Sequence, residues 1–256
     1  MADTPVVLLH PLGADQEFWE PVRDRFGDRS VITIDIAGHG TAAEISPNAH
    51  IDEPTDRLAT QITSALAQFN ATSADVVGVS LGGILAQRLA VTHPQLVRRL
   101  VLADTVAHYP EAMRKMWGDR ADAARAEGTA QFIEPTFTLW FTDGFSDQVV
   151  KERTEQTLRA MPAEAYARAC ELLRDIDLRE DISRIASSTL VVCGEHDGPA
   201  FVAAAPELAT QIPNARLEWL SGGHAVVLER PGTFTRLVVD FLDDSSNLDK
   251  ETSDGR

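Results

Sequence analysis

The chain has 256 residues, and its 23 lysines and arginines stand against 39 aspartates and glutamates, which gives a formal net charge of −16. A charge of this sign repels phosphate backbones, and no basic cluster offsets it, so nucleic-acid binding is excluded as a function class. No apolar stretch approaches the ~18 residues of a membrane helix. Residues 1–9 lack the basic segment of a signal peptide, and Cys170 and Cys193 have no metal-ligand spacing. We therefore expect a cytoplasmic protein with reduced cysteines, no bound metal and no membrane partner.

Short apolar runs alternate along the chain with stretches of helical periodicity. The expected strands are residues 6–9, 31–35, 75–79, 100–104, 189–193 and 217–220. The expected helices are residues 17–26, 55–69, 82–92 and 232–242. The strand runs are rich in β-branched residues and do not alternate with polar ones, which is typical of strands buried on both sides. The pattern predicts an α/β fold with a mostly parallel central sheet and helices on both faces.

Residues 105–185 interrupt this alternation. The segment has no clear strand, and it contains amphipathic stretches at 113–128 and 163–173. We interpret it as a helical cap inserted after the strand that ends at Asp104, because the strand–helix rhythm resumes beyond it; the alternative is additional helical core. The core domain would then comprise residues 1–104 and 186–242, with the cap at 105–185. Residues 243–256 hold five acids and two bases and are expected to form a disordered acidic tail.

Residues 78–82 read Gly-Val-Ser-Leu-Gly and join an expected strand to an expected helix. This strand–turn–helix setting is typical of a nucleophile elbow, which presents its serine at the carboxyl edge of a parallel sheet. Side chains at Gly78 and Gly82 would crowd such a tight turn. The pattern predicts Ser80 as a catalytic nucleophile; the alternative is a serine in an ordinary glycine-rich turn.

A serine nucleophile needs a base and an orienting carboxylate. His224 follows two glycines just after the last expected strand, and it comes after the serine in the chain, as elbow-type enzymes require. Two aspartates compete for the third role. Asp197 is favoured over Asp104 because its loop neighbours the histidine's loop in a sequentially ordered sheet. Asp104 remains an alternative, since the order serine, acid, histidine fits both.

The negative charge that develops on a carbonyl during acyl transfer needs backbone N–H donors. In an elbow-type site one donor is the residue after the nucleophile, here Leu81, and another comes from the loop after the first strand. Pro11 in that loop has no N–H, so Leu12 is the expected second donor. We predict an oxyanion hole formed by Leu12 and Leu81.

These residues together resemble the α/β-hydrolase family with a helical cap, over nearly the whole chain to about residue 242. Within this family, residues 139–145, 166–170 and 173–179 are similar to cap motifs of the 3-oxoadipate enol-lactonases, as are residues 9–13 and the Phe-Trp pair at 18–19. The resemblance implies opening of a lactone or enol-lactone through an acyl-enzyme. It also implies that Trp140, Phe141 and Phe145 line the roof of the substrate pocket.

Three positions depart from these lactonases. His10 and Pro11 stand where the family has Asn-Ser, Ala37 stands where it has arginine, and residues 198–201 lack its usual Thr-Pro-Pro ending. They bear on the substrate and not on the catalytic residues. Other enzymes that use the same serine, histidine and aspartate are alternatives to a lactonase of this type: a carboxylesterase, an acyl-homoserine lactonase, a hydrolase of C–C bonds or a cofactor-free perhydrolase.

A protein of another class, which binds a ligand on this fold without turnover, has no physical reason to keep all the catalytic groups. No G-x-G-x-x-G follows a strand, so no organic cofactor is expected, and the expected partner is a small-molecule lactone or ester. A lactone of the 3-oxoadipate type carries a carboxylate, which needs a local cation in so acidic a protein. The cap offers Arg114, Lys115, Arg120, Arg125, Arg168 and Arg174.

Overall fold

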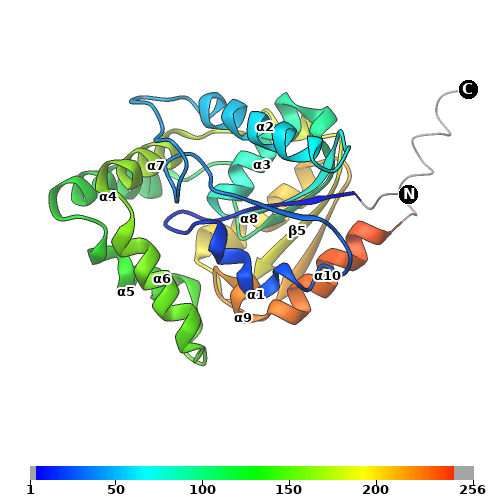
Figure 1. Ribbon diagram of the computed structural model, residues 1–256. Helices are drawn as coiled ribbons and strands as arrows, with labels where there is room; N and C mark the ends of the chain where they lie inside the picture. Colours follow the sequence, from blue (N-terminus) through cyan, green and yellow to red (C-terminus); the bar gives the residue numbers. More distant parts are fainter. Residues whose placement is uncertain (1–3, 245–256) are drawn as a thin grey trace, which may run out of the picture.

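A single parallel sheet organises the computed structural model, which describes residues 4–244 (Figure 1). Its strands are β1 (Val6–Leu9), β2 (Val31–Ile34), β3 (Ala74–Val79), β4 (Val97–Ala103), β5 (Ser188–Gly194) and β6 (Ala215–Leu220). They lie in the order β2-β1-β3-β4-β5-β6, and all five pairings are parallel. The parallel sheet predicted from the sequence is confirmed, and the carboxyl ends of β3, β4 and β5 lie side by side.

Helices cover both faces of this sheet (Figure 1). One face carries α2 (Asp52–Ala67), α3 (Leu81–Thr92) and α8 (Pro199–Gln211), and the other carries α1 (Glu20–Arg23), α9 (Val226–Glu229) and α10 (Pro231–Asp243). Along β1, Val7 and Leu9 belong to the first apolar cluster, whereas Val6 and Leu8 belong to the second. The central strands β1, β3 and β5 are buried against both helical layers, which explains their largely apolar sequences, whereas the edge strand β6 is partly exposed and carries Arg216 and Glu218.

The first expected helix, at residues 17–26, differs from the structure. A 3₁₀ turn at Gln16–Trp19 is followed by the four-residue helix α1. The Asp15 side chain accepts a hydrogen bond from the N–H of Glu17 and so caps the 3₁₀ turn. Pro21 lacks an N–H and cannot donate to a preceding carbonyl, and it stands in the first turn of α1, which is the helical position where proline is best tolerated.

Four helices lie between β4 and β5 and form the cap: α4 (Glu111–Glu127), α5 (Ile133–Trp140), α6 (Gln148–Ala160) and α7 (Ala163–Asp175). In Figure 1 they project to one side of the sheet. An isolated bridge between His108 and Asp177, together with a 2.9 Å hydrogen bond from the N–H of Leu178 to the carbonyl of Ala107, joins the two ends of this insertion. The predicted segment 105–185 encloses these helices.

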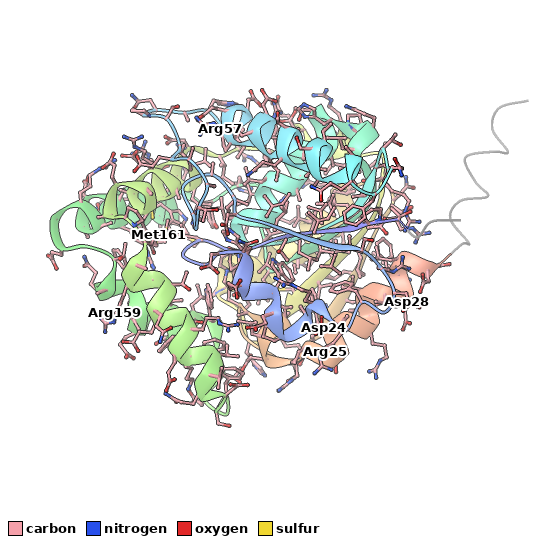
Figure 2. All side chains as sticks on the ribbon, in the orientation of Figure 1. Asp24, Arg25, Asp28, Arg57, Arg159 and Met161 are labelled. Carbon is pink, nitrogen blue, oxygen red and sulfur yellow. The ribbon has the colours of Figure 1, made fainter. Side chains whose placement is uncertain are left out.

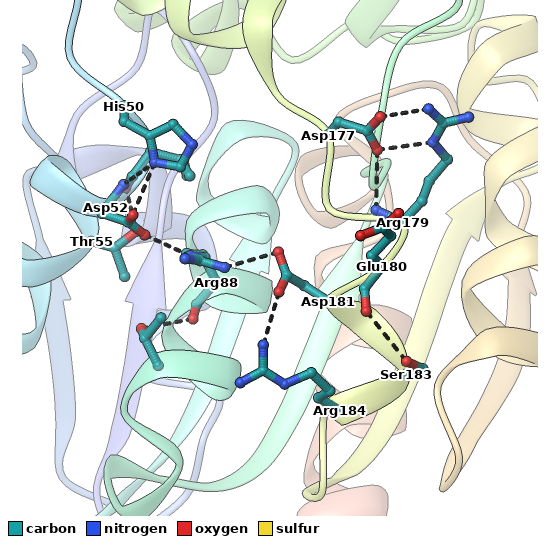
Figure 3. Close-up of polar contacts among 12 residues, drawn as sticks. His50, Asp52, Thr55, Arg88, Asp177, Arg179, Glu180, Asp181, Ser183 and Arg184 are labelled. Carbon is teal, nitrogen blue, oxygen red and sulfur yellow. Dashed lines mark hydrogen bonds and ion pairs between the residues drawn. The ribbon is translucent and has the colours of Figure 1, made fainter.

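Ion pairs tie the segment that returns from the cap to the core helices (Figure 3). Arg88 of α3 donates from Nε to Asp52 at the start of α2, at 2.7 Å, and from Nη1 to Asp181, at 2.8 Å. Asp181 lies between the cap and β5 and also accepts a hydrogen bond from Arg184. The Arg88 side chain is 17% exposed, whereas its partner Asp52 is 46% exposed, so the bridge is partly open to solvent while it joins the end of the cap to α2 and α3.

Charged side chains of both signs lie on the outside of the molecule. Figure 2 shows Asp24, Arg25 and Asp28 around the chain that follows α1, and Arg159 on α6. All four are exposed. Within residues 4–244 no helix is both long and apolar enough to cross a membrane. The predicted acidic tail lies outside the described residues from 245 onward, whereas Asp243 ends α10.

Candidate active site

Ser80 occupies a strained turn between β3 and α3. Its φ of 53° and ψ of −114° lie in a region that residues other than glycine rarely adopt. The turn is held by a 3.0 Å hydrogen bond from the N–H of Ser80 to the carbonyl of Ala103, and the Thr105 hydroxyl donates to the Ser80 carbonyl at 2.7 Å. Strain that neighbouring contacts enforce in this way is typical of functional positions.

The two glycines of the turn allow its neighbouring elements to approach closely. A Cβ at Gly78 would lie 2.5 Å from the carbonyl oxygen of Gly82, and a Cβ at Gly82 would lie 2.3 Å from the carbonyl oxygen of Leu9. Real Cβ atoms do not occur at such distances from backbone oxygens. The sequence pattern therefore reflects packing of the start of α3 directly against β3 and the end of β1.

His224 and Asp197 lie in contact in the two loops that follow β6 and β5. The imidazole Nδ1 is 2.9 Å from Oδ2 of Asp197 and 3.0 Å from Oδ1. An ionised carboxylate only accepts hydrogen bonds, so Nδ1 carries the hydrogen and Nε2 is left as the basic ring nitrogen. Both residues are buried, and the Phe201 ring packs 4.2 Å from the imidazole.

Backbone hydrogen bonds fix the histidine loop to its surroundings. The N–H of His196, in the aspartate loop, donates to the carbonyl of Gly222 at 2.9 Å. The N–H of His224 donates to the carbonyl of Leu139, and the next N–H donates to Trp140, both at 3.1 Å. The last turn of α5 in the cap is therefore bonded directly to the loop that carries His224.

Asp104 lies at the end of β4, fully buried, behind Asp197. Its Oδ1 accepts the N–H of Gly194 at 2.8 Å, and its Oδ2 accepts that of Val226 at 3.4 Å. Burial raises the pKa of Asp104 well above its usual value, and the negative charge of the adjacent Asp197 raises that pKa further. Both effects favour the protonated form of Asp104, and Asp197 is the carboxyl group in contact with His224.

The donor atoms of Asp104, Asp197 and Cys193 lie within 4.8 Å of one another, so this cluster could in principle hold a cation. Metal ligands must be deprotonated, and burial raises the pKa of the Cys193 thiol as it does that of Asp104. Burial therefore opposes the deprotonated forms of Cys193 and Asp104 that a metal ion would need.

A cavity of about 440 Å³ separates the core from the cap, and Ser80, His224 and Leu12 contribute to its wall. We call it the Ser80 cavity. Its volume suits a small-molecule ligand. Its lining also includes residues for which the sequence analysis had proposed no lining role: Met113, Met116, Trp117, Leu139, Tyr166 and Phe201. Three of them recur on one face of α4 at helical spacing, which is a signal that sequence alone could have supplied.

Of the three cap aromatics expected at the pocket, Trp140 lines the Ser80 cavity and the other two do not. The rings of Phe141 and Phe145 stack 4.2 Å apart; Phe141 belongs to the apolar cluster that includes Phe18 and Trp19, and Phe145 packs against that cluster. Trp140 belongs to the same cluster and contacts Phe141 edge-on at 6.2 Å, so its ring lies between the cavity and the cluster. α5 ends at Trp140, and Phe141 has extended backbone.

The residues expected to form an oxyanion hole flank the nucleophile. Leu12 lines the cavity, and Leu81 is the first residue of α3. The buried His10 stabilises the loop before Leu12, because its Nε2 accepts the N–H of Ile36 at 3.1 Å and its Nδ1 lies 2.9 Å from the carbonyl of Pro11. Burial lowers the pKa of His10 to about 4, so the ring is neutral and Nδ1–H is the donor.

The sequence matches the Alpha/beta hydrolase family over residues 6–237, and the chain belongs to this family. Among curated relatives it is similar to 3-oxoadipate enol-lactonase 2 of Acinetobacter baylyi, with 31% identity over 242 residues that cover 93% of this chain and 88% of the relative. It is also similar to the pimeloyl-[acyl-carrier protein] methyl ester esterase of Aliivibrio salmonicida, with 30% identity and coverage of 93% and 91%.

A solved structure is similar over the same extent. The enol-lactonase from Burkholderia xenovorans LB400 aligns with a TM-score of 0.87 at 30% identity, covering 94% of this chain and 92% of that one. The fold and the family predicted from the sequence are confirmed by these comparisons.

Proposed function

We propose that the chain is a serine hydrolase that opens a small lactone or enol-lactone, of the 3-oxoadipate enol-lactone type, through an acyl-enzyme. One observation carries this proposal: the strained Ser80 lines the same cavity as His224, whose Nδ1 is held by Asp197. A nucleophile, a base and an orienting carboxylate in this arrangement perform acyl transfer on unrelated folds.

In the first step His224 Nε2 accepts the Ser80 proton while Oγ attacks the lactone carbonyl carbon. The N–H groups of Leu12 and Leu81 stabilise the oxyanion, and removal of one such donor typically costs about 3 kcal/mol of barrier. The bond between the carbonyl carbon and the ring oxygen then breaks. In an enol-lactone the ring oxygen leaves as an enolate, which takes the proton from the His224 imidazolium and tautomerises to a ketone, so that His224 is neutral again.

The ring opens without losing a fragment, so the acyl-enzyme keeps the ketone arm in the cavity. Water then attacks the acyl carbon while His224 accepts its proton, and Ser80 is released with a carboxylic acid product. Each step uses groups of this chain alone. The apolar wall, which includes Trp117 and Trp140, limits water around the reacting carbonyl and strengthens the hydrogen bonds to the oxyanion.

The similarity to two enol-lactonases favours a lactone substrate. The second candidate is hydrolysis of an open-chain carboxylic ester, and the similarity to a methyl ester esterase at 30% identity favours it. The two reactions use the same residues and differ in whether the alcohol remains attached to the acyl group.

The nucleophile is tested by covalent labelling with a fluorophosphonate. Wild type should be labelled, and Ser80→Ala should not be labelled and should lose about 10⁴-fold or more in kcat on p-nitrophenyl acetate. Ser221→Ala removes an exposed serine from the histidine loop and serves as the matched control, with labelling retained. Full labelling of Ser80→Ala would refute the assignment. An unlabelled wild type without turnover would favour a binding protein.

The substrate class is tested by comparing kcat/KM for an enol-lactone, a saturated lactone and the methyl ester of the same hydroxy acid. A preference for the enol-lactone over the methyl ester supports the lactonase proposal. The reverse order supports the esterase.

A further inference from the structure

One cation of the cap lines the Ser80 cavity. Arg120 lies on α4 on the same face as Met113, Met116 and Trp117, and all four line the cavity together with Ser80. Arg120 is the only side chain with a permanent charge in this lining among the residues that the structure describes. The cavity wall therefore carries a cation in a chain whose net charge is −16.

The Arg120 guanidinium is held by neutral groups. Its Nε donates to the Tyr166 hydroxyl at 2.7 Å. Its Cζ lies 4.3 Å from the centre of the Phe132 ring, and the rings of Tyr166 and Trp117 lie at 5.5 and 5.7 Å. Aromatic faces stabilise a guanidinium without neutralising it. Because an arginine has five N–H donors, this arrangement fixes the group while leaving most of them available.

The other cap cations behave differently. Five of them have a carboxylate partner within 4.0 Å: Arg114, Lys115, Arg125, Arg168 and Arg174. Within residues 4–244 Arg120 has no such partner, and neither of its Nη atoms makes a hydrogen bond there. Lys151 of α6 has no such partner there either, but it lies over the Phe145 ring and is not part of the cavity wall. The cation in the described lining of the Ser80 cavity is thus not neutralised by an acid.

We propose that Arg120 is a carboxylate-binding subsite, so that the substrates are lactones or esters that bear a carboxylate away from the scissile bond. This proposal rests on the proposed hydrolase function and narrows its substrate class. The planar guanidinium can donate two parallel hydrogen bonds to a carboxylate, which orients the substrate as well as attracting it. The apolar lining around it strengthens this pairing relative to water.

The test compares two chromogenic esters of equal chain length. Mono-p-nitrophenyl adipate carries a terminal carboxylate, and p-nitrophenyl hexanoate ends in a methyl group. We expect wild type to prefer the adipate. In Arg120→Gln the ratio of the two kcat/KM values should fall about tenfold or more, which is the effect of losing a charge-assisted hydrogen bond. Arg120→Lys should recover part of the preference, because it keeps the charge but not the planar fork.

Lys115→Gln is the matched control. It removes the same charge from the same helix at a side chain that is 74% exposed and paired with Asp119, so it should leave the ratio unchanged. An unchanged ratio in Arg120→Gln would overturn the subsite. Equal losses on both esters would also overturn it, because they would assign Arg120 a purely structural role.

A binding measurement separates failure of the subsite from failure of the hydrolase proposal. Ser80→Ala should bind hexanoate more tightly than hexanamide in calorimetric titrations, and Ser80→Ala/Arg120→Gln should lose that difference. If wild type hydrolyses neither ester, the hydrolase proposal fails, and the hexanoate titration alone then decides the subsite. Equal binding of hexanoate and hexanamide to Ser80→Ala would overturn the carboxylate-binding subsite.

Discussion

The Asp197 carboxylate contacts the imidazole Nδ1 of His224, and the buried Asp104 carboxyl lies behind it with an oxygen within 4.8 Å of an Asp197 oxygen. The order of residues in the chain allows either aspartate to face the histidine, and the structure places Asp197 there. Asp104 instead accepts the backbone N–H of Gly194. The two acids should therefore respond differently to the same substitution.

Asp197→Asn should lower kcat on p-nitrophenyl acetate by about 10⁴-fold, because an amide stabilises the wrong imidazole tautomer and cannot balance the imidazolium. Asp104→Asn should change kcat by less than about tenfold, since the amide oxygen can still accept from Gly194 and Asp104 makes no hydrogen bond to His224. Asparagine also tolerates the left-handed backbone at this position, where φ is 47°.

Steady-state kinetics on both purified variants provides the measurement, with circular dichroism as the check on folding. A larger loss for Asp104→Asn than for Asp197→Asn would assign the orienting role to Asp104 instead.

The buried Glu229 links the cap to the histidine loop through hydrogen bonds. Its Oε2 accepts the N–H of Gly223 at 2.5 Å, and its Oε1 accepts both the N–H and the hydroxyl of Thr142 at 2.9 and 2.7 Å. Glu229→Ala leaves these donors without an acceptor, so we expect the free energy of unfolding to fall by about 3 kcal/mol. We also expect kcat to fall, because Gly223 precedes His224.

Urea unfolding measures the change in unfolding free energy, and steady-state kinetics measures the change in kcat. Glu218→Ala removes the same charge from an exposed position on β6, so it should change the unfolding free energy by less than about 0.5 kcal/mol. Glu229→Gln keeps one oxygen acceptor and should be intermediate. A Glu229→Ala protein as stable and active as Glu218→Ala would show that the hydrogen bonds of Glu229 neither stabilise the fold nor position the histidine loop.

Local patterns were sufficient to locate the groups around the nucleophile. The turn at Ser80 joins a strand to a helix, and the aspartates and the histidine follow later strands. In a parallel sheet the carboxyl ends of neighbouring strands share one edge, so strand order alone brings Ser80, Asp197 and His224 toward one place. These predictions needed only short-range patterns and the direction of the strands.

Side-chain direction within the cap could not be predicted in this way. Arg120 and Arg125 lie on the same helix, yet Arg120 lines the cavity and Arg125 pairs with Glu164. The sequence of α4 shows an apolar face, but whether that face meets the cavity or another helix depends on how α4 packs against α7 and the core, and the sequence of α4 does not contain that information. Likewise, Trp140 lines the cavity and Phe141 does not because α5 ends between them, and the ends of a helix are hard to predict from a sequence.

The close contact at Gly82 gives a prediction about stability. Alanine is the better helix former by about 1 kcal/mol, so Gly82→Ala would stabilise an isolated helix. Here the added Cβ would meet the backbone oxygen of Leu9 at 2.3 Å, so we expect the free energy of unfolding to fall by more than about 2 kcal/mol. Gly144→Ala has open space around its Cβ and should be near neutral in the same thermal unfolding series. Equal melting temperatures for the two variants would contradict the packing of α3 on β1.

Two buried histidines should make the fold sensitive to acid. The rings of His10 and His39 lie 5.1 Å apart, and burial lowers the pKa of His10 to about 4 and that of His39 to about 3. An unfolded chain binds these protons near pH 6.5, whereas the folded chain does not bind them until the pH is much lower. Between about pH 6.5 and 4 the unfolded state therefore binds more protons, and stability falls as the pH falls.

His39→Gln removes one of these sites. The slope of the unfolding free energy against pH in this window should decrease by about 1.4 kcal/mol per pH unit relative to wild type. The raised pKa of Asp104 contributes a slope of the opposite sign, so the comparison is between the slopes of the two proteins, in which that contribution cancels. Urea titrations at intervals of pH measure the slope of the unfolding free energy for each protein, with His50→Gln as the control at an exposed histidine. Parallel curves for wild type and His39→Gln would mean that His39 is not held neutral in the folded protein.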